Sequence, residues 1–244
     1  LVFYFRKYKT TWKGVLITLG ISFFILSFIM FMVIPYTVFL AGKYEILFVN
    51  DFGLPFNSGT LFYFIVLLGM LIWSIRFTYQ TTHTTLNYII GGVLLLLLSI
   101  FSWTTFLGFL IIVGVYYWYK SNPGRYNRSL VRSAANTIFL SIAFLLIGYS
   151  SFFMLVIRAN TNTPINENDP SDAVSMLSYL NREQYGTWPI GYGQYYNAPQ
   201  DKTDPYDDAT PFYVKDTKKG KYIMTDDRKN TIPNYDKTFC TLFP

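Results

Sequence analysis

Long apolar stretches follow one another through the first two thirds of the chain. Residues 14–34 include no charged side chain over 21 positions, enough to cross about 30 Å of hydrocarbon as a helix. Residues 134–157 form another such stretch of 24 positions. The shorter stretch 61–76 ends in Trp73 and Arg76, an aromatic and a cationic residue typical of the membrane interface. Each of the three stretches predicts a membrane-spanning helix.

Residues 86–119 are uncharged over 34 positions, and one helix of that length would extend about 51 Å. Because this is too long for a single crossing, we expect two short spans, 86–102 and 105–119, joined near Ser102–Thr105. Together with the other stretches this makes about five spans.

Five spans agree with the distribution of basic residues, which favour the cytoplasmic side of a membrane. They place the N-terminal basic cluster, Arg76 and the basic segment 120–132 on that side, whereas four spans would place the last of these outside. We therefore expect a transmembrane domain, residues 1–157, followed by an extracytoplasmic domain, residues 158–244.

The connection between the first two spans, residues 36–60, is unusually apolar for a loop. It predicts an amphipathic helix in the membrane interface that ends at residues 50–53. Such a helix either covers the bundle or forms one wall of a groove for a lipid substrate. In the second case Glu45 or Asp51 would face the cavity.

Residues 158–244 are polar and rich in turn-forming residues, and they predict a small mixed α and β domain. Asp169 followed by Pro170 predicts a helix that starts there and runs to about Glu183. Residues 212–216 and 221–225 flank a turn and predict a hairpin. The lysines of this hairpin are interpreted as a solvated turn; they are Lys215, Lys218, Lys219 and Lys221.

Arg158 follows the last predicted span, where an arginine either anchors the helix at the interface or binds a lipid phosphate with two hydrogen bonds. Other polar and aromatic residues of the outer domain are candidates for an acceptor site or cavity, although turn formation and packing explain them as well. These candidates are Asn166, Glu167, Asn168, Arg182, Tyr185, Trp188, Tyr192 and Tyr195.

The composition excludes an ordinary soluble domain and disfavours a protein that binds nucleic acid. Apolar residues make up 52% of the chain and charged residues 14%, which is far from an ordinary soluble domain. Ten basic and two acidic residues precede Arg158, and ten basic and twelve acidic residues lie from Arg158 onward. The net positive charge therefore belongs to the membrane-flanking segments, which argues against binding of nucleic acid.

Few side chains are available for metal or cofactor chemistry. Cys240 is the only cysteine and His83 the only histidine, which excludes an internal disulfide and a histidine cluster for zinc. The sequence also contains no Asp-x-Asp triplet and no glycine-rich phosphate loop. We expect no metal site and no cofactor.

Several segments resemble a family of large polytopic proteins from Bacteroidota, the protein O-mannosyltransferase-like glycosyltransferases. The resemblance runs over nearly the whole chain and is carried by residues 47–59, 147–151, 166–168, 178–186 and 192–199. It implies the distal part of a GT-C architecture that transfers a sugar from a polyprenyl phosphate to Ser or Thr of exported proteins.

In the resembled family a catalytic aspartate lies in an early outer loop, and this chain corresponds to the part that follows it. We therefore expect more chain beyond both ends, and Asp51 is not assigned that role. The resemblance also implies a bacterial inner-membrane protein with a periplasmic C-terminal domain. It makes Arg158 the candidate contact for the donor phosphate.

The partners implied are membrane lipid, the polyprenyl-phosphate sugar and an exported polypeptide. A competing hypothesis is a non-catalytic membrane subunit whose aromatic-rich outer domain binds export machinery or another membrane protein. Half of a transporter is disfavoured because the spans lack an internal charged pair. A native start near Leu1 would favour the subunit, and further spans before it would favour the enzyme.

Overall fold

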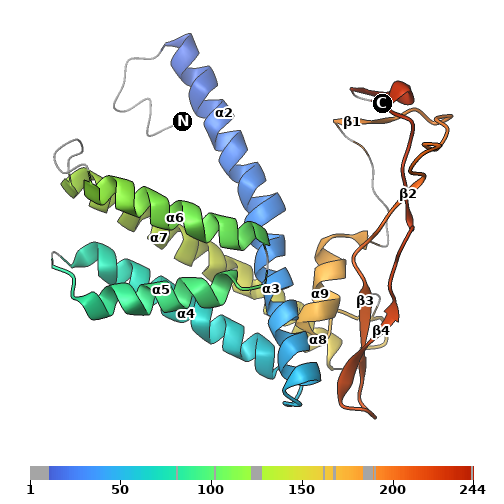
Figure 1. Cartoon of the computed structure of the whole chain (residues 1–244), viewed down its shortest axis with the longest axis horizontal. Helices are drawn as coiled ribbons and strands as arrows, with labels where there is room; N and C mark the ends of the chain where they lie inside the picture. The colour runs from blue at the N-terminus through green and yellow to red at the C-terminus, as the bar shows by residue number, and fades with distance from the viewer. Residues whose placement is uncertain are drawn as a thin grey trace.

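The structure is a computed structural model that describes residues 11–80, 82–101, 103–121, 128–161, 163–166, 169–183, 189, 191–242 and 244. It is mostly helical, with a region of short strands near the C-terminus (Figure 1). The α-helices are α2 (Trp12–Phe28), α3 (Ile34–Ile46), α4 (Ser58–Tyr79), α5 (Thr85–Ser99), α6 (Trp103–Ser121), α7 (Arg128–Tyr149), α8 (Phe153–Ala159) and α9 (Ala173–Leu180).

The first helices join into one continuous helix of 40 residues, Trp12–Asp51. Two π-helical turns, Ile29–Val33 and Leu47–Asp51, are part of it. The helix expected in the connection 36–60 is therefore not a separate helix, because the first helix continues through Pro35 without a break. Proline lacks an N–H and crowds the preceding turn, and here the wider π turn directly before Pro35 accommodates it.

The end of this long helix is where the sequence predicts it. The π turn stops at Asp51, and the N–H of Phe52 still donates to the carbonyl of Leu47. Gly53 follows with φ +67°, a left-handed conformation that favours glycine.

Helices α4 to α7 run side by side, and the long helix crosses near their ends (Figure 1). The Trp73 indole of α4 donates to the carbonyl of Asn87 on α5 at 3.0 Å. The Thr78 hydroxyl donates to the Asn136 side chain of α7, also at 3.0 Å. These polar contacts hold α4 against α5 and α7, because donors that are wholly or partly buried need partners.

The charge-free stretch 86–119 forms two helices, α5 and α6, as expected. The break between them lies at Ile100 and Phe101, and Ser102 lies outside the described residues. Among the described residues three helices are long and apolar enough to cross a membrane: Trp12–Asp51, Ser58–Tyr79 and Ser129–Ala159. The apolar helices Thr85–Ser99 and Phe106–Trp118 are shorter, so five spans remain a prediction.

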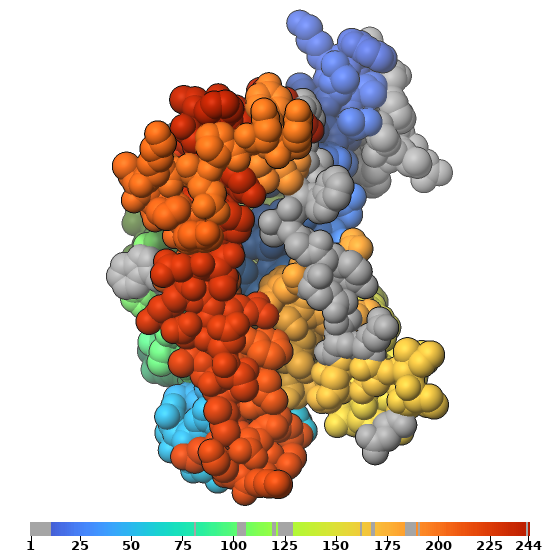
Figure 2. Space-filling model, turned by 90° about the vertical axis from the view of Figure 1, so that its right-hand side faces the viewer, coloured from blue at the N-terminus to red at the C-terminus, as the bar shows by residue number. Residues whose placement is uncertain are grey.

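Three antiparallel pairs of strands form an arm beside α3 and α9, seen along its length in Figure 2. The predicted hairpin is confirmed, with Gly220 at φ +63° in its turn. The pairs are β1 (Tyr192–Gln194) with β6 (Cys240–Leu242), β2 (Tyr206–Asp207) with β5 (Ile232–Pro233), and β3 (Phe212–Asp216) with β4 (Lys221–Asp226).

The helix predicted to start at Asp169 begins three residues later than expected and is shorter. Asp172 is the N-cap of α9, and its carboxylate accepts from the N–H of Val174 at 3.0 Å and of Ser175 at 2.8 Å. The Ser175 hydroxyl accepts in return from the N–H of Asp172 at 3.2 Å. This reciprocal capping box outweighs the Asp-Pro signal, and Asp169 adopts φ +31° instead.

The described core lies between α3 and α4 and is centred on Tyr44. The Tyr44 hydroxyl donates to the carbonyl of Leu97 on α5. Its ring contacts Phe101 edge-on at 4.5 Å and lies 5.8 Å from Tyr63. Tyr44 therefore joins three helices, and it lies one residue before the carboxylate that organises the site described next.

Candidate functional site

Glu45 on α3 is completely buried, with an exposed fraction of 0%. Its carboxylate accepts from the N–H of Asn57, from the N–H of Thr60 at 2.9 Å and from the Thr60 hydroxyl at 3.0 Å. These donors belong to the first turn of α4, where backbone N–H groups lack partners within the helix. Glu45 thus caps α4 from a neighbouring helix and lies inside the packing, not on the wall of a cavity.

Asp172 is a second buried carboxylate, 4% exposed, and it caps α9. Its free oxygen Oδ2 accepts from the hydroxyl of Tyr222 on β4 at 3.1 Å. The same hydroxyl lies 3.4 Å from Oε1 of Glu45. Two capped helix N-termini therefore meet at one phenol, which comes from the distant hairpin.

Tyr222 is held in this place by further contacts. The Asn50 side chain pairs with its backbone in both directions, at 2.8 Å from N–H to Oδ1 and at 2.9 Å from Nδ2 to the carbonyl. Burial, and then the negative charges of Asp172 and Glu45, raise the pKa of the Tyr222 phenol well above its usual range. The phenol therefore stays protonated at neutral pH, and its one hydrogen is donated to Asp172, the nearer of the two carboxylates.

We define the buried cluster as Glu45, Asn50, Asp172 and Tyr222. Every polar group named in it is engaged with another part of the chain. A buried and satisfied network of this kind holds elements together rather than acting on a substrate. Its role is to dock the β3–β4 hairpin onto α3, α4 and α9.

The variant Tyr222→Phe tests this role. It removes the hydroxyl between two carboxylates, and hydrogen bonds to charged groups contribute about 1.5–3 kcal/mol. We expect the local opening free energy of residues 212–226 to fall by about that amount, measured as faster backbone hydrogen exchange in detergent. Tyr206→Phe is the matched control because Tyr206 is 40% exposed. Unchanged exchange in Tyr222→Phe would show that the hydroxyl does not dock the hairpin.

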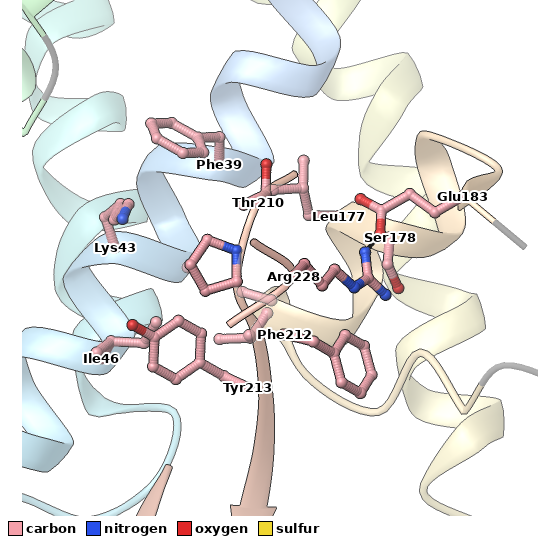
Figure 3. Close-up of a pocket in the computed structure, with 14 residues that line it drawn as sticks. Phe39, Lys43, Ile46, Leu177, Ser178, Glu183, Thr210, Phe212, Tyr213 and Arg228 are labelled. Atoms are coloured by element: carbon pink, nitrogen blue, oxygen red, sulfur yellow. Dashed lines mark hydrogen bonds and ion pairs between the residues drawn. The ribbon is translucent and has the colours of Figure 1, made fainter. Parts of the chain in front are cut away.

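A groove lies beside the buried cluster, between α3, α9 and the start of β3 (Figure 3). Its cavity volume is about 80 Å³, so it receives only a small group. The lining is mostly apolar with a few charged side chains, and it consists of Phe39, Gly42, Lys43, Ile46, Ala173, Val174, Leu177, Ser178, Glu183, Thr210, Pro211, Phe212, Tyr213 and Arg228.

The charged side chains of the groove differ in whether they form an ion pair. Nη1 of Arg228 lies 2.5 Å from Oε2 of Glu183, and its guanidinium stacks 5.0 Å from the Phe212 ring centre. Nζ of Lys43 lies 5.5 Å from the ring centre of Phe39, and no ion pair found within the described residues includes it. Figure 3 shows Lys43 on the α3 side, opposite the Arg228–Glu183 pair. Among the described residues of the groove, Lys43 is therefore the cation available to an anionic ligand.

The candidate phosphate ligand Arg158 lies in the last turn of α8 and is exposed. It does not belong to the groove lining. Asn166 donates to the carbonyl of Ala159 at 3.2 Å and to the Asp169 carboxylate at 2.9 Å, so it shapes the loop after α8. Asp51 is exposed at the end of the long helix.

The other candidates do not gather into one site with the groove. Arg182 lies just after α9 at φ +55°, next to the groove residue Glu183. Tyr192 and Tyr195 are 58% and 49% exposed on and just after β1. The remaining candidates lie outside the described residues; they are Glu167, Asn168, Tyr185 and Trp188.

Sequence reasoning missed the residues that organise the site. Lys43 is not among the candidates from the sequence, because its place in the groove depends on α9 and β3 being beside α3. Arg228 pairs with Glu183 across 45 residues, and Tyr222 reaches Glu45 across 177. No local pattern marks such pairs. The one usable signal was a lone lysine in an otherwise apolar connection.

Comparison with known proteins finds a match only for the C-terminal region of this chain. Residues 186–244 match the model of a family of unknown function, DUF8416. Neither the curated proteins nor the solved structures contain a match. The similarity covers strands β1 to β6, and it includes Tyr222 and Arg228 but none of the helices that they contact.

Proposed function

We propose that this chain is part of an integral-membrane glycosyltransferase that transfers a sugar from a polyprenyl phosphate to Ser or Thr of exported proteins. The proposal places it in the bacterial inner membrane with five spans and a periplasmic outer region. Helices long and apolar enough to cross a membrane support the membrane location. The resemblance to the protein O-mannosyltransferase-like glycosyltransferases supports the type of transferase.

The observation that carries the proposal is an apolar groove between the long helix and the outer region. Among the described residues that line it, Lys43 is the cation outside any ion pair. A polyprenyl-phosphate sugar joins an apolar chain to a phosphate, so it needs apolar surface beside a positive charge. Phe39, Ile46 and Leu177 supply the first, and Lys43 supplies the second. The small volume limits the bound part to the groups around the phosphate.

Sugar transfer breaks the bond between the anomeric carbon and a phosphate oxygen as the acceptor hydroxyl attacks that carbon. The hydroxyl proton passes to a base, and the polyprenyl phosphate leaves with additional negative charge. A cation fixed beside that phosphate stabilises the leaving group. Lys43 is the residue of this chain that we assign to this task.

The carboxylates of the described residues near the groove are already engaged. Glu183 is paired with Arg228, and Glu45 and Asp172 are buried in the cluster. This supports a substrate-binding role for this part of the enzyme. The catalytic base would then belong to the segment that precedes this part in the resembled family.

The test is transfer from a radiolabelled polyprenyl-phosphate sugar to a Ser/Thr peptide by the full native protein. We expect Lys43→Gln to lower kcat/KM about tenfold, because losing one charge-assisted contact costs roughly 1.4 kcal/mol in the transition state. We expect Lys43→Arg to retain most activity. Lys202→Gln, also an exposed lysine, is the control.

The outcomes separate the possible phosphate ligands. Loss of activity in Arg158→Ala with full activity in Lys43→Gln would move the phosphate to the end of α8 and contradict the groove assignment. Absence of transfer by the native protein from every polyprenyl-phosphate sugar offered would overturn the proposed function.

One observation favours the alternative, a non-catalytic membrane subunit that binds a protein partner. Three tyrosines around the β1 end of the arm are strongly exposed: Tyr192, Tyr195 and Tyr196, at 58%, 49% and 102%. Exposed tyrosines are common in protein interfaces. The intact mass of the natively purified protein distinguishes the two functions. A measured mass of 28.4 kDa, that of these 244 residues, would leave no room for a further catalytic loop and would favour the subunit.

A further inference from the structure

The loop between the long helix and α4 exposes apolar side chains at the edge of a candidate span. Phe52 is 63% exposed and Leu54 is 41% exposed. Helix α4 is a candidate span and begins at Ser58, directly after this loop. Since a span begins where the hydrocarbon begins, residues 52–57 lie at the membrane boundary.

The β3–β4 hairpin is fastened to this same loop. Nζ of Lys215 lies 4.6 Å from the ring centre of Phe56, and the Tyr222 ring contacts Phe56 edge-on at 5.4 Å. Figures 1 and 2 both show the closed end of the hairpin beside the lower end of the long helix. The turn of the hairpin therefore lies at the membrane boundary as well.

We define the lysine turn as residues 215–221, which hold four lysines and one aspartate. The Asp216 carboxylate accepts from the N–H of Lys218 at 2.9 Å and of Lys219 at 3.2 Å, so it shapes the turn. The side chains of Lys218, Lys219 and Lys221 are exposed. Residues from Arg158 onward have more acidic than basic residues, so this positive charge is local.

We propose that the lysine turn and the loop 52–57 form one surface that binds anionic phospholipids of the adjoining leaflet. Lysines beside a bilayer are attracted to anionic headgroups, and Phe52 and Leu54 insert among the lipid chains at the interface. A turn that merely points into water would not need exposed apolar residues next to it. The sequence alone indicated only a solvated turn.

Lipid binding at this surface also stabilises the buried cluster, because the lysine turn is directly connected to Tyr222. Lys221 directly precedes Tyr222, and Lys215 pairs with Tyr222 across the hairpin. A headgroup that holds the turn therefore also holds the Tyr222 hydroxyl against Glu45 and Asp172. This surface does not depend on the proposed transferase activity, since it rests on the spans and the hairpin alone.

The test uses the full chain in nanodiscs of phosphatidylcholine, with and without phosphatidylglycerol. We expect phosphatidylglycerol to slow backbone hydrogen exchange of residues 212–226 by about threefold or more at low salt, and high salt to reduce the effect. The triple variant Lys218→Glu, Lys219→Glu, Lys221→Glu is expected to lose this lipid dependence.

The matched control makes the same charge change outside the lysine turn, at Lys202→Glu, Lys229→Glu and Lys237→Glu, and is expected to keep the lipid dependence. The triple variant Lys218→Gln, Lys219→Gln, Lys221→Gln removes charge without reversing it, and it serves if the Glu variant does not fold. Equal exchange of the wild type in both lipids would overturn the proposal. So would equal loss of the lipid dependence in the control variant.

Discussion

Replacing Gly59 with alanine is expected to force α3 and α4 apart and to lower the free energy of unfolding by roughly 3 kcal/mol. A Cβ at this position would lie 2.2 Å from the carbonyl oxygen of Tyr44 and 2.6 Å from the Cα of Glu45. Both are backbone atoms, so no change of side-chain rotamer relieves the contact. The absent side chain is what lets the first turn of α4 reach the Glu45 carboxylate.

Gly69 on the same helix provides the control. A Cβ there meets only Cδ2 of Leu94, at 3.8 Å, which is ordinary van der Waals contact. Because alanine favours the helix over glycine by about 1 kcal/mol, Gly69→Ala is expected to be neutral or stabilising. Denaturant unfolding of both variants in detergent, followed by circular dichroism, measures the difference. Equal stability of the two variants would contradict the close approach at Gly59.

The second large effect is expected from Glu45→Ala, at roughly 3 kcal/mol of destabilisation. The change leaves the N–H groups of Asn57 and Thr60 and the Thr60 hydroxyl without their acceptor in a buried place. It also removes one of the two carboxylates that face the Tyr222 hydroxyl. The start of α4 and the docked hairpin are both expected to loosen, visible as faster hydrogen exchange in each.

Asp51→Ala is the matched control for Glu45→Ala, since Asp51 is an exposed carboxylate at the end of the same long helix. We expect its effect to remain within about 0.5 kcal/mol. Glu45→Gln keeps one acceptor oxygen but turns an amide toward N–H donors, so an intermediate loss is expected. A double-mutant cycle of Glu45→Gln with Tyr222→Phe measures their coupling, and additive losses would show that the two side chains do not interact.

Helix α3 connects the features of this protein because its faces serve different neighbours. Glu45 faces the start of α4, and Lys43 and Phe39 face the groove. Gly42 faces α9, where a Cβ would make ordinary van der Waals contact with the carbonyl of Ala173 at 3.5 Å. A change in α3 is therefore expected to affect the groove and the C-terminal strand region together.

The sequence by itself determined the local elements. The uncharged stretches became helices, and residues 86–119 formed two helices, as the length of that stretch predicts. Gly53 and Gly220 were found where the chain needs a positive φ, at the end of the long helix and in the hairpin turn. These outcomes depend on residues close together in the chain, which is why patterns of a few residues predict them.

Tertiary structure decided what these elements do. The long helix continues past Pro35, and its second part, α3, packs against both α4 and α9. Glu45 was a candidate for a cavity wall and became the buried cap of another helix. Its partner Tyr222 lies 177 residues away, in strand β4, where no sequence pattern marks it as a partner of Glu45. Hydrogen bonding and burial across such separations leave no periodicity in the sequence, so only the folded chain reveals them.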